Sequence, residues 1–331
     1  MSTRSYAILG TGALGGYYGG RLAHAGAEVH FLLRSDYRHV RDHGLRIDSV
    51  CGGFHLSADT LHAYGDPGEL PPCDVAVVCL KTTQNGQLPA LLDRCVKPDG
   101  VVLVLQNGLH PEADAAAVVG EGRVLGGLCF LCSNKVGPGH IDHLDFGHVH
   151  LGVYAPGSHT TPRSEPARSP ASAHFRGPAH FQGVVDDFNA TGIDATAVDD
   201  LRRSRWKKLI WNIPYNGLSV VLNQTTDVMM ADPDTRRRIE TVMREVQAAA
   251  LAVDGKAIDD AFIEQMLRYT ESMRPYKTSM MLDHEAGRPL EVEAIVGDPL
   301  RASIAAGREV PAIKKLYQQL TDTQPGTQGH A

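Results

Sequence analysis

Three polar residues lie four apart in an otherwise apolar stretch, RSRWKKLIWNIPYNGLSVVLNQ. They are Lys208, Asn212 and Asn216, and on a helix residues at i, i+4 and i+8 lie along one face. Polar side chains buried there without partners would cost free energy. One interpretation is a cleft wall whose amine and two amides bind an anion or a hydroxylated small molecule. The other is a helix packed against a second polar element, and this stretch alone does not decide between them.

A glycine-rich turn lies between the first predicted strand, 6–9, and the first predicted helix, 13–25. It fits the pattern G-x-G-x-x-G, in which the first glycine permits a tight turn and the second lets a pyrophosphate approach the backbone. The third lets helix and strand pack closely. The N–H groups at the helix start can then bind phosphates. We predict dinucleotide binding here, rather than a purely structural turn, by Gly10, Thr11, Gly12, Ala13, Leu14 and Gly15.

The end of the second predicted strand, 29–33, indicates which dinucleotide binds. An acid at that position would hold the ribose 2′-hydroxyl of NAD, whereas an arginine can accept the 2′-phosphate of NADP. Arg34 stands there, nineteen positions after Gly15, and favours NADPH/NADP+ as the cofactor. The alternative is that Asp36 serves the 2′-hydroxyl one turn later.

Two further polar residues follow predicted strands 74–80 and 101–105. Lys81 ends the first of these strands, and Asn107 follows the second in the sequence QNG. Ligands of open α/β sheets gather at the carboxyl ends of the strands, so both are candidates for the edge of the cofactor site. Each could equally be a helix cap or a turn former.

Alternation of strands and helices predicts an α/β fold, with a Rossmann-type doubly wound domain at the N-terminus and an all-α helical domain at the C-terminus. Continuous apolar runs such as DVAVVCL suit a parallel sheet that is covered on both faces. We expect the NADP-binding domain over 1–198, with a flexible Pro- and Ser-rich insertion at about 156–178. The helical substrate domain follows over 199–322, and a disordered tail over 323–331.

Composition excludes several functions for these 331 residues. The net charge of −6 shows no basic excess, so no nucleic-acid partner is expected, and no apolar run is long enough to span a membrane. No signal peptide is visible, which predicts a cytoplasmic protein with mostly reduced cysteines. The pair Cys129 and Cys132 has the spacing of a redox or zinc motif, but the sequence has no second CxxC to complete a metal site. His140, His143, His148 and His150 match no common set of metal ligands and are expected at the surface, so no metal is predicted.

These motifs together resemble the ketopantoate reductase (2-dehydropantoate 2-reductase) family. The resemblance rests on ILGTGALGG with Arg34, on CLKTTQ, LQNG and WKKLIWNIPYN, and on TSMMLDHEAGRPLEVEAIVG. It implies that Lys208 is the general acid and that Asn212, Asn216 and Ser279 hold the carboxylate and hydroxyl of the substrate. It also implies that Glu291 contacts substrate or cofactor ribose, that Asn107 lies at the nicotinamide end, and that Lys81 belongs to the cofactor side. One asparagine of the family pattern is replaced here by Thr226.

The implied reaction is NADPH-dependent reduction of 2-dehydropantoate to pantoate, a step of pantothenate biosynthesis. It needs a hydride at C2 and a cation that stabilises and then protonates the developing alkoxide. Lys208 suits both roles, and Lys207 is the poorer candidate because it points about 100° away on an ideal helix. Glu291 could instead complement a helix dipole, as Glu293 could. Pro214 is expected to kink the helix between the two asparagines.

Two other functions agree with the same motifs. One is a related NADP-dependent reductase of another 2-keto or 3-hydroxy acid, which Thr226 and the insertion would permit. The other is a regulator that binds NADP(H) without catalysis, although such a protein would not need Lys208 and Glu291. The expected partner is a small-molecule 2-keto acid; a homodimer is compatible with the sequence, which indicates no oligomeric state.

Overall fold

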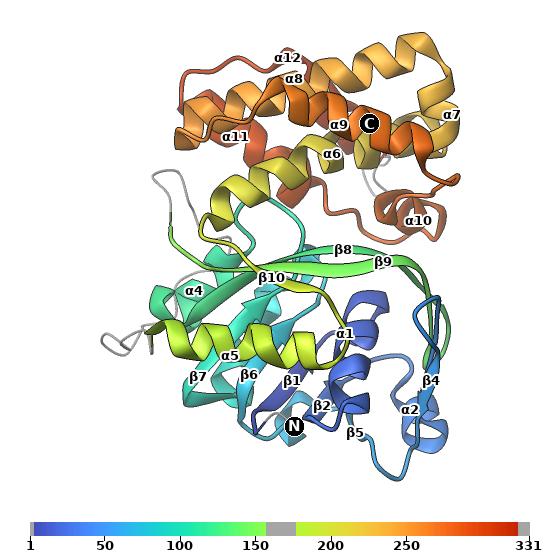
Figure 1. Ribbon diagram of the computed structural model, residues 1–331, viewed down its shortest axis with the longest axis vertical. Helices are drawn as coiled ribbons and strands as arrows, with labels where there is room; N and C mark the ends of the chain where they lie inside the picture. The colour runs from blue at the N-terminus through green and yellow to red at the C-terminus, as the bar shows by residue number, and fades with distance from the viewer. Residues whose placement is uncertain (1–2, 157–176, 324–331) are drawn as a thin grey trace, which may run out of the picture. The chain divides into compact units, whose positions relative to one another are not determined.

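The computed structural model describes residues 3–156 and 177–323 (Figure 1). The chain forms two compact units. The first contains residues up to 106, residues 111–156, and the chain from α5 to Leu201; the second contains 107–110 and the chain from 202 onward. A four-residue excursion, 107–110, therefore belongs to the second unit although its neighbours in the sequence belong to the first.

The first unit is built on one sheet, whose strands in the described residues follow the order β4-β3-β9-β8-β7-β6-β1-β2-β5, with β10 beside β9. Pairing is parallel throughout except for β3 with β4 and β8 with β9. The strands are β1 (Ser5–Leu9), β2 (Glu28–Leu32), β3 (Leu45–Ser49), β4 (Phe54–Leu56), β5 (His62–Tyr64), β6 (Cys73–Val78), β7 (Val96–Val104), β8 (Val124–Gly137), β9 (His140–Val153) and β10 (Ala195–Ala197).

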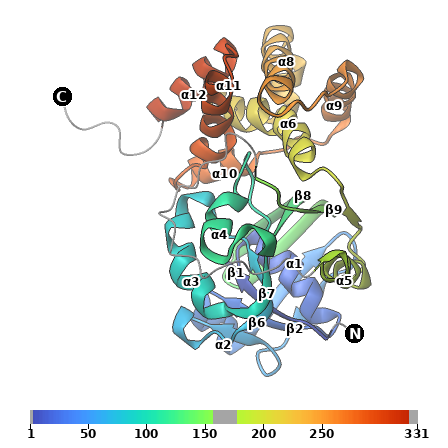
Figure 2. The same ribbon diagram turned by 90° about the vertical axis from the view of Figure 1, so that its left-hand side faces the viewer.

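Both faces of the central strands are buried, as the continuous apolar runs predict. Alternate residues of β1 separate: Ile8 joins an apolar core on one face, and Ala7 and Leu9 join a second core on the other. Helices α1 (Ala13–His24) and α5 (Gly177–Ala190) cover the first face, and α3 (Leu88–Cys95) and α4 (Glu112–Val119) cover the second (Figure 2). This doubly wound arrangement confirms the predicted fold class.

The sheet reverses its winding at β1. From β1 the chain continues to β2 on one side, whereas β6 pairs with β1 on the other side. Such a switch point leaves the carboxyl ends of the two central strands side by side, with the loops that follow them diverging. The residues that follow β1 and β6 are the glycine turn and Lys81, so the topology brings two predicted cofactor elements to one edge.

The second unit is helical. Its core gathers apolar side chains from every long helix and includes Leu109 from the excursion. Its elements are α6 (Leu201–Leu222), α7 (Thr226–Ala231), α8 (Pro233–Asp254), α9 (Asp260–Ser272), α10 (Ser279–Glu285), the π-helix η4 (Glu293–Gly297), α11 (Asp298–Ala305) and α12 (Pro311–Thr323).

Turns and strand pairing define the local structure of the first unit. Gly26 follows α1 with φ of +87°, and the chain turns at residues 52–53 between the antiparallel strands β3 and β4. Strand β9 begins at His140 and pairs with β8 along most of its length, despite three register shifts. Most of the predicted flexible insertion, 157–176, and the tail from 324 lie outside the described residues.

The expectation that the four histidines of β9 lie at the surface is wrong for His143. Its ring is buried, with Nδ1 2.8 Å from the hydroxyl of Ser49 and its face against Tyr17 at 4.4 Å between ring centroids. His148 and His150 are half-buried and pack on Phe130. In the part of the chain that the structure describes, no three or more His, Cys, Asp or Glu residues are grouped to hold a metal. No described helix is long and apolar enough to cross a membrane.

Burial lowers the pKa of His143 below its ordinary value, because the charged ring would lose its hydration. The folded protein then binds fewer protons than the unfolded chain as the pH falls below about 6.5. We expect the melting temperature to fall between pH 7.5 and pH 5.5, and this fall to shrink in His143→Gln. The measurement is thermal unfolding at both pH values, with His39→Gln, at an exposed position of helix α2 (Tyr37–His43), as the control. An equal fall in parent and His143→Gln would contradict the assignment.

Candidate active site

The glycine turn of the first unit has the geometry that its pattern predicts. Gly10 has φ of +100°, and a Cβ placed on it would lie 2.9 Å from the backbone nitrogen of Leu80. A Cβ on Gly15 would lie 2.3 Å from the carbonyl oxygen of Gly10. Both positions therefore require glycine, one for the approach of β1 to the chain after β6 and one for the approach of helix to turn.

Gly12 is different, since a Cβ placed there would meet nothing within 4 Å. The residue is exposed at the N-cap of α1, no side chain caps this end, and the first turn carries no acid. A helix start of this kind suits the phosphates of a dinucleotide. Ala13 and Leu14 begin the helix half-buried, whereas the hydroxyl of Thr11 donates to the carbonyl of Leu32 at 2.9 Å and ties the turn to β2.

Arg34 and Asp36 have opposite surroundings. Arg34 is exposed just after β2, and its guanidinium lies 3.5 Å from the side-chain oxygen of Gln84. Asp36 is buried and accepts hydrogen bonds from Lys135 at 2.5 Å and from the backbone of Gly139 at 3.1 Å. Its pKa is lowered because the partners that favour the charged form outweigh burial. The carboxylate that was the alternative ligand for a ribose is thus engaged within the protein.

Lys81 lies at the carboxyl end of the β6 segment, exposed, where it precedes the 3-10 helix η2 (Thr82–Gln87). The backbone of Gln84 donates to the carbonyl of Lys81 at 2.8 Å, which fixes the first turn of η2. Arg34, Gln84 and Lys81 therefore belong to one edge of the sheet in the first unit.

Lys208, Asn212 and Asn216 form a polar stripe on α6 in the second unit, as predicted. Asn212 and Asn216 are only 6% and 3% exposed, and Lys208 is half-buried one turn before them. Lys207 points elsewhere, because its ammonium lies 5.0 Å from the ring centroid of Phe262. The helix is continuous across Pro214 from Leu201 to Leu222.

Two buried hydroxyls connect this stripe to helix α10. The hydroxyl of Ser219 donates to the carbonyl of Asn216 at 3.0 Å and lies 2.7 Å from the hydroxyl of Thr278. Thr278 in turn caps α10 by accepting from the backbone of Met281. Ser279, an exposed predicted ligand, is the next residue, so this contact sets its place relative to Asn216. The sequence interpretation missed Ser219 and Thr278, although Ser219 is three residues beyond Asn216 on the same helix face.

Thr226 has a structural role in this chain. It is fully buried, its hydroxyl accepts from the backbone nitrogen of Tyr276 at 3.2 Å, and its own backbone nitrogen donates to the carbonyl of Tyr276 at 3.1 Å. This reciprocal pair holds the segment that leads into Thr278 and Ser279. Thr226, which replaces the family's asparagine, therefore supports the segment that carries Ser279.

Glu291 and Glu293 are clearly distinguished by their surroundings. Glu291 is 5% exposed and lies just before the helical segment that includes η4. Glu293 is exposed and is bound by the guanidinium of Arg301 and the hydroxyl of Tyr317, both at 2.6 Å. Glu293 is thus a surface acid with its own partners, and Glu291 is the acid that lies inside the second unit.

Asn107 is placed by contacts of its own segment with the π-helix. The backbone of Leu109 donates to the carbonyl of Ala294 at 3.3 Å, and Gly108 has φ of +125°. A Cβ on Gly108 would lie 2.8 Å from that same carbonyl oxygen. The widened turn of a π-helix is frequent at functional sites, and here it receives the backbone that carries Asn107. Asn107, Lys208, Asn212, Asn216, Ser279 and Glu291 all belong to the second unit.

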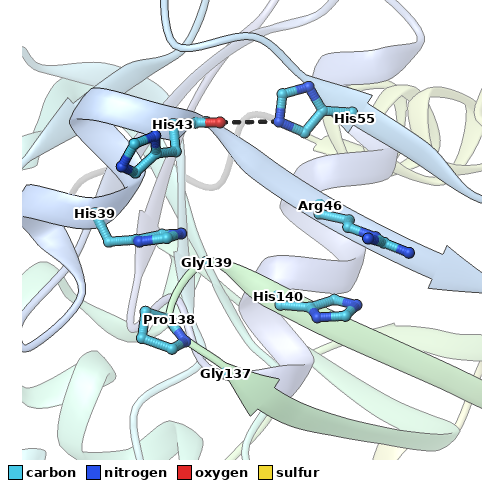
Figure 3. Close-up of a pocket in the computed structure, with 9 residues that line it drawn as sticks. His39, His43, Arg46, His55, Gly137, Pro138, Gly139 and His140 are labelled. Carbon is cyan, nitrogen blue, oxygen red and sulfur yellow. Dashed lines mark hydrogen bonds between the residues drawn. The ribbon is translucent and has the colours of Figure 1, made fainter.

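A pocket of about 350 Å³ elsewhere in the first unit contains none of the predicted site residues. The rings of His39, His43, His55 and His140 and the guanidinium of Arg46 surround it (Figure 3). Asp48 accepts from both Arg46 and His140, so it balances charge at this rim. The side chains of His39, His43 and Arg46 are exposed to solvent. The pocket is therefore a solvent-exposed hollow of the first unit.

The glycine turn at the switch point of a parallel sheet, followed by a helical unit that carries a lysine and two amides, defines a Rossmann-type dehydrogenase with a C-terminal helical domain. A family model described as "Ketopantoate reductase PanE/ApbA" matches residues 6–156, and its C-terminal counterpart matches residues 200–324. The chain belongs to the ketopantoate reductase family, which confirms the resemblance seen in the sequence. It is an oxidoreductase of the kind that acts on CH–OH groups, and ketopantoate reductases use NADPH.

Relatives match along nearly the full length. A 2-dehydropantoate 2-reductase from Nostoc sp. is 51% identical over 320 residues, which cover 97% of this chain and 95% of the relative. The 2-dehydropantoate 2-reductase from Geobacter metallireducens, whose crystal structure is known, is 37% identical in sequence to this chain. The two structures superpose with a TM-score of 0.87, over 96% of this chain and 99% of the other. The enzyme from Methylococcus capsulatus is 28% identical with a TM-score of 0.81, covering 98% and 100%.

The backbone approach of Gly108 to Ala294 gives a stability prediction. Gly108→Ala adds a Cβ to a left-handed residue, at a cost of about 1–2 kcal/mol, and overpacks the contact, at about 1–3 kcal/mol more. Gly52→Ala, with φ of +96° and open space, should show only the first cost. Urea denaturation of both variants and of the parent measures the two costs. Equal destabilisation in the two variants would show that the contact with Ala294 is loose.

Proposed function

We propose that this protein catalyses the NADPH-dependent reduction of 2-dehydropantoate to pantoate. The observation that carries the proposal is the set of polar residues gathered in the second unit: a half-buried lysine, two buried amides on one face of α6, and a serine tied to that face. The 51% identity to a 2-dehydropantoate 2-reductase over almost the whole chain supports the choice of substrate.

The first unit fits the cofactor. The open backbone face at Gly12 and the start of α1 would receive the pyrophosphate, and Arg34 would receive the 2′-phosphate. Lys81 and Gln84 would contribute polar groups at the same edge. When bound, NADPH supplies the hydride that C2 of the keto acid accepts.

The second unit fits the keto acid. Lys208 would place its ammonium at the C2 oxygen, stabilise the negative charge that develops there, and donate the proton. Asn212, Asn216 and Ser279 would donate to the carboxylate and bind the hydroxyl of the substrate, and their buried backbone supports keep these groups in position. Glu291 and Asn107 would complete the polar lining, Glu291 against the substrate or the cofactor ribose and Asn107 at the nicotinamide end.

Steady-state kinetics with 2-dehydropantoate and a panel of other 2-keto acids test this function and its substrate. The parent protein should prefer 2-dehydropantoate by kcat/KM, and Lys208→Ala should lower kcat about 10²–10⁴-fold while it still binds NADPH. The matched control is Lys207→Ala, because the neighbouring ammonium lies over Phe262 and should be dispensable. A better substrate in the panel would identify a related reductase, and full activity of Lys208→Ala would refute the proposed acid.

Arg34 gives a separate test of cofactor choice. A hydrogen bond to a charged group contributes about 1.5–3 kcal/mol, so Arg34→Ala should lower kcat/KM for NADPH by roughly 10–100-fold. The value for NADH should change little, because NADH has no 2′-phosphate. Arg38→Ala, at an exposed arginine of α2, is the control. Equal losses with both cofactors would mean that Arg34 does not contact the 2′-phosphate.

A further inference from the structure

A group of buried polar side chains lies beneath the carboxyl edge of the sheet in the first unit. Asn85, Gln106 and Asp114 are 2%, 3% and 2% exposed, and they come from η2, from the end of the β7 segment and from the first turn of α4. Burial of an amide or a carboxylate costs free energy unless partners replace water. The three side chains are therefore expected to be partners of one another.

Short hydrogen bonds connect them in a line. The amide nitrogen of Asn85 donates to the carboxylate of Asp114 at 2.6 Å, and the amide nitrogen of Gln106 donates to the side-chain oxygen of Asn85 at 2.6 Å. The same nitrogen of Gln106 donates to the backbone carbonyl of Leu80 at 2.8 Å. The line therefore runs from Asp114 through Asn85 to Gln106 and ends on the backbone that follows β6.

Three of the four residues of this line are next to a candidate ligand. Leu80 directly precedes Lys81, and Asn85 follows Gln84, whose side chain lies against Arg34. Gln106 directly precedes Asn107. Loops that follow different strands have no regular backbone ladder between them, so side chains must fix their separation. In this protein the central link of that support is Asn85.

We propose that Asn85 is a positioning residue for the cofactor, because it holds the loop after β6 against the end of β7 and so sets the places of Lys81 and Gln84. Asp114 fixes the orientation of the Asn85 amide, and Gln106 links that amide to the backbone of Leu80 through its own two hydrogen bonds. This inference rests on the proposed function, since it assigns Lys81, Gln84 and Arg34 to NADPH.

The test measures NADPH binding by nicotinamide fluorescence without keto acid, together with the KM of each substrate. Asn85→Ala should weaken NADPH binding about tenfold and change the KM for 2-dehydropantoate less than twofold. Asp114→Asn keeps an oxygen that accepts from Asn85, so its NADPH affinity should stay within about threefold of the parent. The control is Tyr6→Phe, which removes another buried hydrogen bond of the same unit, from Tyr6 to Asp187 at 2.5 Å. It should lower the melting temperature without changing NADPH affinity.

A purely structural role would give the opposite result: Asn85→Ala would lose stability like Tyr6→Phe and keep its affinity for NADPH, and that would overturn the inference. So would a loss in Asp114→Asn as large as that in Asn85→Ala. If Asn85→Ala does not fold, Gln106→Met breaks the same line from its other end and should weaken NADPH binding about tenfold, whereas unchanged affinity would overturn the proposal. If the parent itself fails to bind NADPH, the proposed function fails before this inference is tested.

Discussion

The architecture of the first unit depends on the close approach of the backbone at Gly10 to the backbone at Leu80. Only a residue without Cβ, in a left-handed conformation, permits this distance. This approach places the glycine turn beside the loop that carries Lys81, at the point where the sheet reverses its winding. Gly12, with its open backbone face, and the start of α1 come directly after this contact in the chain, so the contact also fixes their positions.

In the second unit the candidate ligands are spread over almost two hundred residues of sequence, so contacts between distant segments must fix their positions. Asn107 arrives on a backbone contact with a π-helix, and Ser279 is tied to Asn216 through two hydroxyls. Both of these supports are buried. If these residues bind the substrate as proposed, such supports would hold them in place before it binds and would lower the entropy lost in reaching the transition state.

Patterns with a fixed period or spacing were readable from the sequence. The parallel strands, the glycine turn, the helical C-terminal half and the stripe at positions 208, 212 and 216 all follow from local rules. Residues that act through long-range partners were not readable. Nothing local distinguishes Glu291 from Glu293, and the burial of His143 depends on Tyr17 and Ser49, which are about a hundred residues away. Asp36 and Thr226 show the same limit, because their partners Lys135 and Tyr276 lie far along the chain.

The excursion of residues 107–110 into the second unit has a consequence for how the polypeptide can be divided. Leu109 is part of the helical core, yet it is encoded between β7 and α4 of the sheet unit. A fragment that begins at Arg202 would lack one of its own core side chains and the backbone donor to Ala294. The helical unit, although it occupies the C-terminal part of the chain, is thus incomplete as an independent segment.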